Sequence, residues 1–377
     1  MKRSDYKRLG DYIREVDLRN RDLAVTEPMG ININKYFMPS VANIIGTDLS
    51  KYKIVGKRQF ACNLMHVGRD GKIPIAVLQH DVAIIVSPAY LVFEIIDDTA
   101  LIPEYLMMWF RRSEFDRNAW FYTDADVRGG LSKQALFDMT LPVPSIERQR
   151  AIVAEYEALS RRINLNRSTI AQLEATAQTL YRKMFVDDIA PEHLPSGWRW
   201  DSIFNICDVV YGFPFDSSLF TNMSTSIPVI RIRDITNNTT NTYTTERVQE
   251  KYLILNGDIL IGMDGNFQVT IWNGSKAYLN QRIVRIRTKS DMYIPALQIV
   301  NAIKIPLARL QSSIEGTTVA HLSDKDMKQL RVLVAPMEEQ MLFYRNVHII
   351  SNVLANIFQQ QIKFTELQSL LLAKMGQ

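Results

Sequence analysis

The sequence predicts an α+β protein in which one unit occurs twice, each copy being a mixed globular domain followed by a single long helix. Three observations lead to this prediction: a segment that recurs in the second half of the chain, two long stretches with helical periodicity, and short β-branched runs between turn residues elsewhere. The chain has 377 residues, of which 47% are hydrophobic. That content is enough to form two cores and argues against extensive disorder.

The recurring segment comprises residues 131–184 and 322–375, which align without a gap. Most mismatches keep apolar character where helical periodicity requires it, so a coincidence between two amphipathic helices is the weaker explanation. The matching positions in the first copy are Leu131-Ser132, Val143, Glu147-x-Gln149 and Leu180-x-x-Lys183-Met184, and in the second copy Leu322-Ser323, Val334, Glu338-x-Gln340 and Leu371-x-x-Lys374-Met375.

Each copy includes a helical stretch of about 40 residues, roughly 60 Å long at 1.5 Å per residue. Apolar residues in it follow alternating three- and four-residue steps, the spacing of a coiled-coil seam. Because one such helix alone would expose its stripe, we expect the two to pack as an antiparallel coiled coil with pseudo-two-fold symmetry. The predicted seam residues are Ile152, Tyr156, Leu159, Ile163, Ile170, Leu173, Ala177, Leu180 and Met184, and then Phe343, Val347, Ile350, Leu354, Ile357, Phe364, Leu371 and Met375.

Three polar residues interrupt this seam: Asn166, Gln361 and Gln368. Polar seam residues can fix the register and orientation of two helices. The sequence leaves an equal alternative, in which these residues lie where the helices diverge or where another subunit packs. Since two helices cannot cover all of this apolar surface, we also expect self-association in the absence of partners.

The predicted organisation is a first globular domain at 1–146, a helix at 147–186, a second globular domain at 187–337 and a helix at 338–377. Both globular parts contain short strand-like runs, and a helical piece falls at a similar place in each. The strand candidates are Ile73–Leu78, Val82–Val86, Val229–Arg233, Ile259–Ile261 and Ile283–Arg287, and the helix candidates are Pro103–Arg112 and Pro295–Gln311.

The composition restricts the chemistry that the chain can perform. Its net charge of +4 permits a polyanionic partner only if basic residues gather on one face. The sequence shows no Walker A loop, dinucleotide fingerprint or Asn/Asp-Pro-Pro-aromatic motif, and Asp70-Gly-Lys72 is better interpreted as a turn than as half of a nuclease motif. Cys62 and Cys207 have no paired spacing. We therefore expect no catalytic centre, no metal and no cofactor, in a cytoplasmic protein without a membrane segment.

The doubled architecture resembles the specificity subunits of Type I restriction-modification systems. The resemblance covers most of the chain and is strongest from residue 131 onward. The first domain departs from the pattern, because it lacks a Gly-Asp-Ile-Leu run and has Gly68-Arg-Asp-Gly-Lys72 instead. The motifs that carry the resemblance are Leu322-Ser-Asp-x-x-Met327, Pro336-Met-Glu-Glu-Gln340, Gly197-Trp-Arg-Trp200, Tyr211-Gly212, Pro228-Val-Ile-Arg231-Ile-Arg233-Asp-Ile235, Gly257-Asp-Ile-Leu-Ile-Gly262-Met-Asp-Gly265 and Ala277-Tyr-Leu-Asn280-Gln281-Arg282.

The resemblance implies two target-recognition domains, each reading one half of a bipartite sequence in double-stranded DNA. It also implies that the paired helices act as a spacer and dock methyltransferase subunits, which restriction subunits join. Within each domain, phosphate contacts are expected from Lys and Arg, and base contacts from Arg, Asn or Gln. The candidate residues are Arg69, Lys72, Arg128 and Lys133 in the first domain, and Arg231, Arg233, Asn266, Gln268, Arg282, Thr317, Thr318 and His321 in the second.

Two other functions remain open at this point. One is an enzyme, a diverged fused DNA methyltransferase or nuclease, which would modify or cleave DNA alone. The other is a coiled-coil repeat scaffold that binds only proteins, which would bind no duplex with or without partner subunits.

Overall fold

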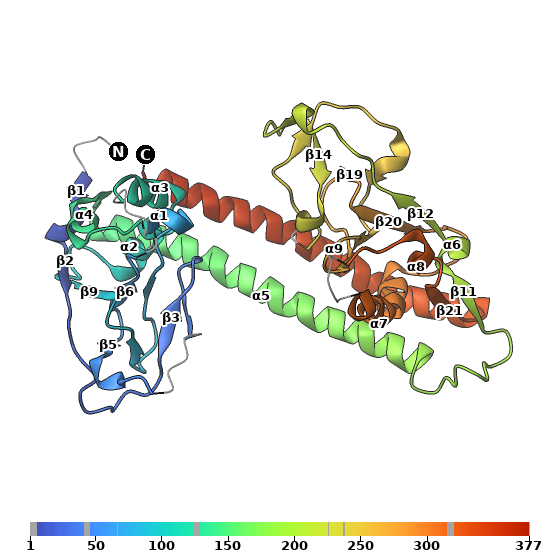
Figure 1. The fold of residues 1–377 in the computed structure, drawn as a ribbon, viewed down its shortest axis with the longest axis horizontal. Helices are drawn as coiled ribbons and strands as arrows, with labels where there is room; N and C mark the ends of the chain where they lie inside the picture. Colours follow the sequence, from blue (N-terminus) through green and yellow to red (C-terminus); the bar gives the residue numbers. More distant parts are fainter. Residues whose placement is uncertain are drawn as a thin grey trace. The chain divides into compact units, whose positions relative to one another are not determined.

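The computed structural model describes residues 6–40, 46–65, 67–123, 129–224, 226–236, 238–314 and 320–376 (Figure 1). Contacts between residues divide the chain into two compact units. Unit 1 contains Met1–Arg162 and Phe364–Gln377, and unit 2 contains Ile163–Lys363. Both long helices contribute residues to both units, so the predicted boundaries at 146, 186 and 337 remain a prediction.

Unit 1 is built around a four-stranded antiparallel sheet with the order β2-β9-β6-β7, together with the strand pairs β1-β10, β3-β4 and β5-β8. Its elements, in chain order, are β1 (Tyr6–Arg8), η2 (Leu9–Asp11), β2 (Ile13–Glu15), β3 (Met29–Ile31), β4 (Phe37–Pro39), η3 (Leu49–Lys51), β5 (Lys53–Val55), β6 (Phe60–Cys62), α1 (Val67–Asp70), β7 (Ile75–Val77), β8 (Ile84–Val86), β9 (Leu91–Ile95), α2 (Pro103–Phe110), α3 (Ser113–Phe121), α4 (Lys133–Asp138), β10 (Thr140–Pro142) and the start of α5 (Ile146–Phe185).

Unit 2 contains an antiparallel sheet with the order β12-β20-β17-β18, a mixed five-stranded sheet with the order β13-β15-β14-β19-β16, and the pair β11-β21. Its elements are β11 (Arg199–Ser202), α6 (Ile203–Ile206), β12 (Cys207–Tyr211), η4 (Ser217–Leu219), β13 (Phe220–Thr221), β14 (Ile227–Ile230), η5 (Ile232–Asp234), β15 (Tyr243–Thr244), η6 (Glu250–Tyr252), β16 (Leu253–Ile254), β17 (Ile259–Gly262), β18 (Val269–Ile271), β19 (Ala277–Leu279), β20 (Ile283–Thr288), α7 (Ala296–Ile314), α8 (Asp324–Met327), β21 (Arg331–Val334) and α9 (Met337–Lys374).

The two units share one topology, which extends the repeat beyond the segment visible in the sequence. In each unit the first strand pairs with the last, as β1 does with β10 and β11 with β21. A short helix and a four-stranded sheet of the same strand order follow, then helix α2 or α7, a short serine-capped helix and the long helix. The predicted α+β fold class is therefore confirmed.

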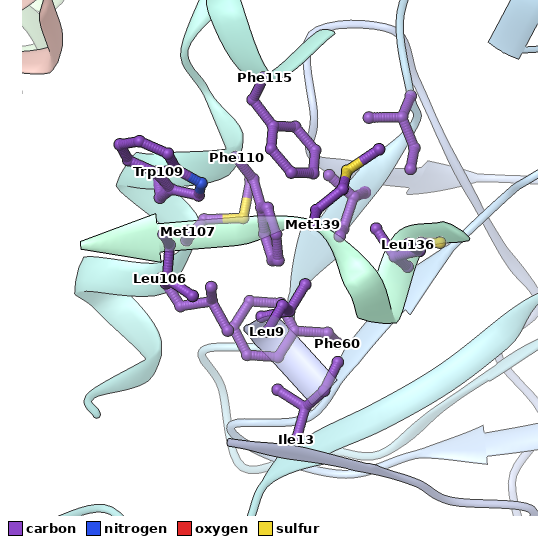
Figure 2. Packing of buried hydrophobic residues seen from close by; sticks show 14 of the residues in the cluster. Leu9, Ile13, Phe60, Leu106, Met107, Trp109, Phe110, Phe115, Leu136 and Met139 are labelled. Atoms are coloured by element: carbon purple, nitrogen blue, oxygen red, sulfur yellow. The ribbon is translucent and has the colours of Figure 1, made fainter. Parts of the chain in front are cut away.

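The core of unit 1 lies between its four-stranded sheet and helix α2 (Figure 2). Phe60 and Phe93 stack with their ring centroids 5.0 Å apart, and Phe110 from α2 meets both rings edge-on. Helix α2 buries almost every side chain because the sheet covers one of its faces and α3, α4 and β10 cover others. The core of unit 2 is built in the same way from β17, β20 and α7.

The long helices run antiparallel, as the contacts within each unit show. In unit 1 the beginning of α5 packs against the end of α9, where Tyr156 and Val153 join one cluster with Leu372 and Met375. In unit 2 the end of α5 meets the beginning of α9, and the Phe185 and Phe343 rings lie 5.0 Å apart. The predicted pairing of the helices is thus confirmed.

The predicted seam residues are all buried or half-buried. Periodicity missed Val153 and Phe185, which are buried because the globular parts of their units cover them. Of the interrupting polar residues, Gln368 donates a hydrogen bond to Ser160 of α5 (2.7 Å), as expected of a residue that fixes register. Asn166 is 5% exposed, and its Nδ2 has no partner among the described residues.

A buried glutamine explains one identity in the repeat. Gln149 and Gln340 each hydrogen-bond to backbone groups of a neighbouring loop in their own unit. Gln149 Nε2 donates to the carbonyls of Ala100 and Pro144, and its Oε1 accepts from the Ile102 amide. Gln340 Nε2 likewise donates to the Tyr293 carbonyl (3.3 Å). Each glutamine therefore joins the first turn of a long helix to the loop before α2 or α7.

One expectation about local structure was wrong. The strand predicted at Val229–Arg233 ends at Ile230, and Ile232 and Arg233 begin the 3-10 helix η5. Asp234 causes this turn, because its carboxylate accepts a hydrogen bond from the Arg231 amide (3.0 Å) in the manner of a capping box.

Candidate nucleic-acid interface

In unit 2 the loop between β17 and β18 carries Asn266 and Gln268 and contacts the segments that carry Arg282 and His321. Backbone hydrogen bonds tie this loop to two other segments: the Leu322 amide donates to the Met263 carbonyl (2.8 Å), and the Gly265 amide to the Ala320 carbonyl (2.9 Å). The Met263 amide donates to the carbonyl of Arg282 (3.0 Å). Three segments that are distant in the sequence therefore meet at one exposed edge.

Asp264 holds two of the predicted basic residues at this edge. Its carboxylate lies 3.1 Å from a terminal guanidinium nitrogen (Nη1) of Arg282 and 2.6 Å from Nδ1 of His321. The Arg282 and His321 side chains are still about half exposed. An anion that approached this edge would meet the Arg282 guanidinium beside the His321 ring, and Asp264 would compete with it for Arg282.

The other predicted residues of unit 2 lie on or near the same loop. Asn266 is exposed and Gln268 half-buried, both within the turn that joins β17 to β18. Arg231 lies 3.6 Å from Asp234 and is largely covered, whereas Arg233 is exposed. The intervening Ile232 contacts Gly262 at the end of β17.

Unit 1 has the same arrangement in the loop between β6 and β7. The Leu131 amide donates to the Leu64 carbonyl (2.8 Å), and the Gly68 amide to the Gly129 carbonyl (2.7 Å). These bonds correspond to the two that fix the loop in unit 2. The predicted residues Arg69 and Lys72 lie on this loop, so the candidates of the two domains occupy equivalent places.

Only glycine fits where this loop of unit 1 meets the chain after α3. A Cβ atom added to Gly68 would lie 2.7 Å from the Cα of Gly129, and Gly129 has a φ of +57°. Such a close approach of two backbones excludes any side chain.

A buried ion pair supports the far end of the same loop. Asp116 on α3 accepts from the Ile73 amide (3.1 Å) and from Nζ of Lys35 (2.7 Å). Lys35 also donates to the Phe110 carbonyl. Burial lowers the pKa of Lys35 even though Asp116 opposes this shift. The exposed Lys72 is therefore adjacent to a fixed backbone position.

The structure does not bring every candidate to these loops. Lys133 forms a 2.7 Å ion pair with Glu15 of β2, and no described contact joins it to Arg69 or Lys72. Arg69 itself pairs with the adjacent Asp70 (2.7 Å). The candidates Arg128, Thr317 and Thr318 lie outside the described residues.

Neither a metal-ligand cluster nor an exposed thiol is found among the described residues. No three His, Cys, Asp or Glu side chains among them come together as a set that could hold a metal ion. Cys62 and Cys207 are buried, and burial raises the pKa of both thiols, that of Cys207 to about 12. Within the same residues, no helix is long and apolar enough to cross a membrane.

Comparison with known proteins reveals a partial similarity to one family. Residues 195–366 match the family model described as the Type I restriction modification DNA specificity domain. The chain is also 33% identical over 143 residues to the Type I restriction enzyme EcoBI specificity subunit of Escherichia coli. Over these segments the chain is similar to Type I specificity subunits.

The two curated relatives align with different shares of the chain. The EcoBI match covers 38% of this chain and 30% of that relative. The MjaVIII specificity subunit of Methanocaldococcus jannaschii is 25% identical over 115 residues, which is 30% of this chain and 27% of the relative. The chain therefore matches less than a third of the length of these curated relatives.

A solved structure extends the likeness in fold to nearly the whole chain. The crystal structure of the Type I restriction-modification S subunit from M. genitalium superimposes with a TM-score of 0.58 at 14% identity. The superposition covers 99% of this chain and 96% of that one. At this identity the likeness concerns the fold alone.

Sequence reasoning missed Asp264, although it lies in one of the motifs that carried the resemblance. A search for basic and amide side chains passes over a carboxylate. What Asp264 contributes is the alignment of Arg282 and His321, which depends on contacts between β17, β20 and the segment before α8. The spacing of these residues in the sequence gave no sign of it.

Proposed function

We propose that this chain is a Type I specificity subunit and reads a bipartite sequence in double-stranded DNA, with one half-site bound by the loops of each unit. The observation that carries the proposal is the loop described above, which recurs in both units with the same backbone hydrogen bonds and with exposed basic side chains. Basic side chains on exposed loops suit phosphate contacts, and Arg, Asn and Gln suit base edges.

The different side chains on the two loops support separate half-sites. Unit 1 presents Arg69 and Lys72, whereas unit 2 presents Arg282, His321 and Asn266. Two sites that recognise different sequences need the same backbone geometry but different side-chain donors, and the two loops have this combination. The distance between the half-sites would follow from the length of α5 and α9.

The partners in this proposal are methyltransferase subunits, which dock on the paired helices, and restriction subunits, which join them. Three apolar side chains of α9 in unit 2 support a docking role: Leu342, Ile349 and Val353 are 61%, 66% and 40% exposed. They recur at seven- and four-residue steps, on a face other than the one that carries Phe343, Val347 and Ile350. Such a stripe is expected to be covered in an assembly.

The decisive experiment is methylome sequencing of a strain that carries this chain with its cognate methyltransferase subunits. The expected result is one methylated bipartite motif. Arg282→Ala should then weaken binding of a duplex with that motif by about 5- to 150-fold, because a bidentate arginine contributes about 1–3 kcal/mol of discrimination. Tolerance of substitutions should increase in one half-site and remain unchanged in the other.

Arg199→Ala is the matched control, since Arg199 is equally exposed and forms a similar ion pair, 3.2 Å from Asp201, outside the loops of unit 2. Its binding should equal that of the unmodified chain. The absence of any bipartite motif, or methylation by the purified chain alone, would refute the proposal.

A further inference from the structure

Three consecutive exposed aromatic side chains of unit 1 form one corner at the end of α3. Trp120, Phe121 and Tyr122 are consecutive, and they are 55%, 76% and 56% exposed. The opposite face of α3 is anchored in the core through Phe115 and Ala119. Because these three aromatic rings are more than half exposed, the stability of the fold does not account for their presence on the outer face of α3. We refer to these three residues as the aromatic corner.

The aromatic corner is held beside the candidate DNA-contacting loop of unit 1. Nε1 of Trp120 donates to the carbonyl of Gly68 (3.2 Å), the residue before Arg69. Helices α1 and α3 are in contact, and Figure 1 shows them side by side. The rings of Phe121 and Tyr122 meet edge to face, with centroids 5.4 Å apart. The aromatic corner is therefore held in place by contacts among its own rings and with Gly68.

Basic residues lie on α3 and on the loop between β6 and β7, the two segments that form this part of unit 1. Arg69 and Arg117 have side chains that are 66% and 74% exposed, and Lys72 is exposed as well. Among the described residues, Asp70 pairs with Arg69 at 2.7 Å and Glu114 pairs with Arg117 at 3.5 Å. Aromatic rings between basic residues are typical of surfaces that contact nucleic-acid bases as well as phosphates.

Unit 2 shows that this position borders the loop in both copies of the repeat. There Gln311 of α7 takes the place of Trp120, since its Oε1 accepts from the Phe267 amide of the loop (3.0 Å). The next two residues are Ser312 and Ser313, both exposed. The same place therefore has polar residues in one unit and aromatic residues in the other.

We propose that Phe121 and Tyr122 contact bases of the first half-site and help to determine its sequence. This inference rests on the proposed function and deepens it. Trp120 acts as the positioning residue that fixes the corner against Gly68. An apolar ring can pack on a thymine methyl group or enter a base step, and the basic neighbours would hold the flanking phosphates.

The test replaces the two rings with the residues that unit 2 has in their place, in the double variant Phe121→Ser and Tyr122→Ser. The full chain with its methyltransferase subunits is titrated with duplex oligonucleotides that carry the methylated motif, or that motif with each base pair of the first half-site replaced in turn. Binding of the motif should weaken by about 5- to 150-fold, as expected for the loss of one base–aromatic contact of about 1–3 kcal/mol. Discrimination should be lost in the first half-site only.

The matched control is Val82→Ser, which removes a 65% exposed apolar side chain elsewhere in unit 1 and should leave binding unchanged. Thermal melting of the double variant should match that of the unmodified chain, because both rings are more than half exposed. Unchanged affinity and discrimination in a complex that still recognises its motif would overturn this inference alone. Loss of methyltransferase binding with DNA affinity retained would identify a protein-docking surface and overturn it too. If the unmodified complex recognises no motif, the proposed function and this inference fail together.

Discussion

At the scale of single residues, the two units hold the same turn with different side chains. In unit 2 the carboxylate of Asp258 accepts from the Leu255 amide (2.7 Å) and from Arg287 on β20 (2.6 and 2.7 Å). In unit 1 the Oε1 of Gln59 accepts from the Gly56 amide (2.7 Å), and its Nε2 donates to Glu94 on β9 (2.9 Å). The hydrogen-bond geometry is retained, but in unit 1 the carboxylate lies on the strand and a neutral amide lies in the turn.

This exchange explains why the sequence suggested that the first domain departs from the pattern. The Gly257-Asp258 pair has a counterpart in Arg58-Gln59, because the Arg58 amide donates to Leu78 as the Gly257 amide donates to Trp272. Arg58 even adopts the positive φ, +67°, that glycine takes with ease. Residue types differ at these positions, so a search for motifs could not detect a relationship that lies in hydrogen bonds.

The Asp258 carboxylate should matter more to stability than the Gln59 amide. Asp258→Ala leaves Arg287 and the Leu255 amide without their buried acceptor, at a cost of about 3 kcal/mol in the free energy of unfolding. Gln59→Ala removes uncharged donors and acceptors and should cost about 1 kcal/mol. Urea denaturation of the two variants measures the difference. Equal losses of stability in the two variants would show that water replaces Asp258 as the hydrogen-bond acceptor of Arg287, which is 36% exposed.

The two cysteines should be inert in the folded protein. Cys62 lies in unit 1 and Cys207 in unit 2, and both are almost fully buried. Burial raises the pKa of each thiol, so the reactive thiolate is scarce at neutral pH. Labelling with an aromatic disulfide at pH 8 should therefore be slow and should follow the opening of the unit that holds each thiol.

Single variants Cys62→Ala and Cys207→Ala then assign each labelling phase to one unit. With Asp258→Ala in the background, labelling of Cys207 should accelerate more than labelling of Cys62. Rapid labelling of either thiol in the unmodified chain would contradict the packing around β6 or β12.

At the scale of elements, periodicity was sufficient to find the long helices and their partners. Apolar steps of three and four residues identified α5 and α9, because a helix pair is stabilised along its whole length by one repeated contact. The same reasoning could not show that Val153 and Phe185 are buried, since they face the globular parts and not only the seam. The turn at η5 was missed for a similar reason: one Asp234 carboxylate overrides the β propensity of Ile232.

The apolar stripe of α9 gives a prediction about this helix as an element. Replacing Leu342, Ile349 and Val353 together by serine should weaken association with methyltransferase subunits, because their exposed area is available for burial at an interface. Copurification of tagged chains measures the association, and light scattering should show less self-association of the chain alone. The control is Val82→Ser, which changes an exposed apolar side chain of unit 1 away from α9. Unchanged copurification would exclude this face as the docking surface.

At the scale of the whole molecule, the sequence was sufficient to predict a doubled α+β fold but not its full extent. The gapless alignment began at Leu131, whereas the shared strand order begins at β1 and β11. Long helices preserve apolar spacing, while short strands preserve only backbone hydrogen bonds, to which many residue types are suited. The same holds for the candidate site: charge and amide content identified Arg69 and Asn266, and only the fold revealed that they lie on equivalent loops.

Modularity is the prediction that belongs to the molecule as a whole. If each unit reads its own half-site, replacing residues 1–146 by the corresponding domain of another specificity subunit should change one half of the methylated motif and leave the other half unchanged. The spacer between the halves should also persist, because α5 and α9 retain their lengths of 40 and 38 residues. Methylome sequencing reads both halves and the spacer in one measurement. A change in both half-sites would mean that the loops of the two units do not act independently. The doubled topology would then reflect how the chain folds and not how it recognises DNA.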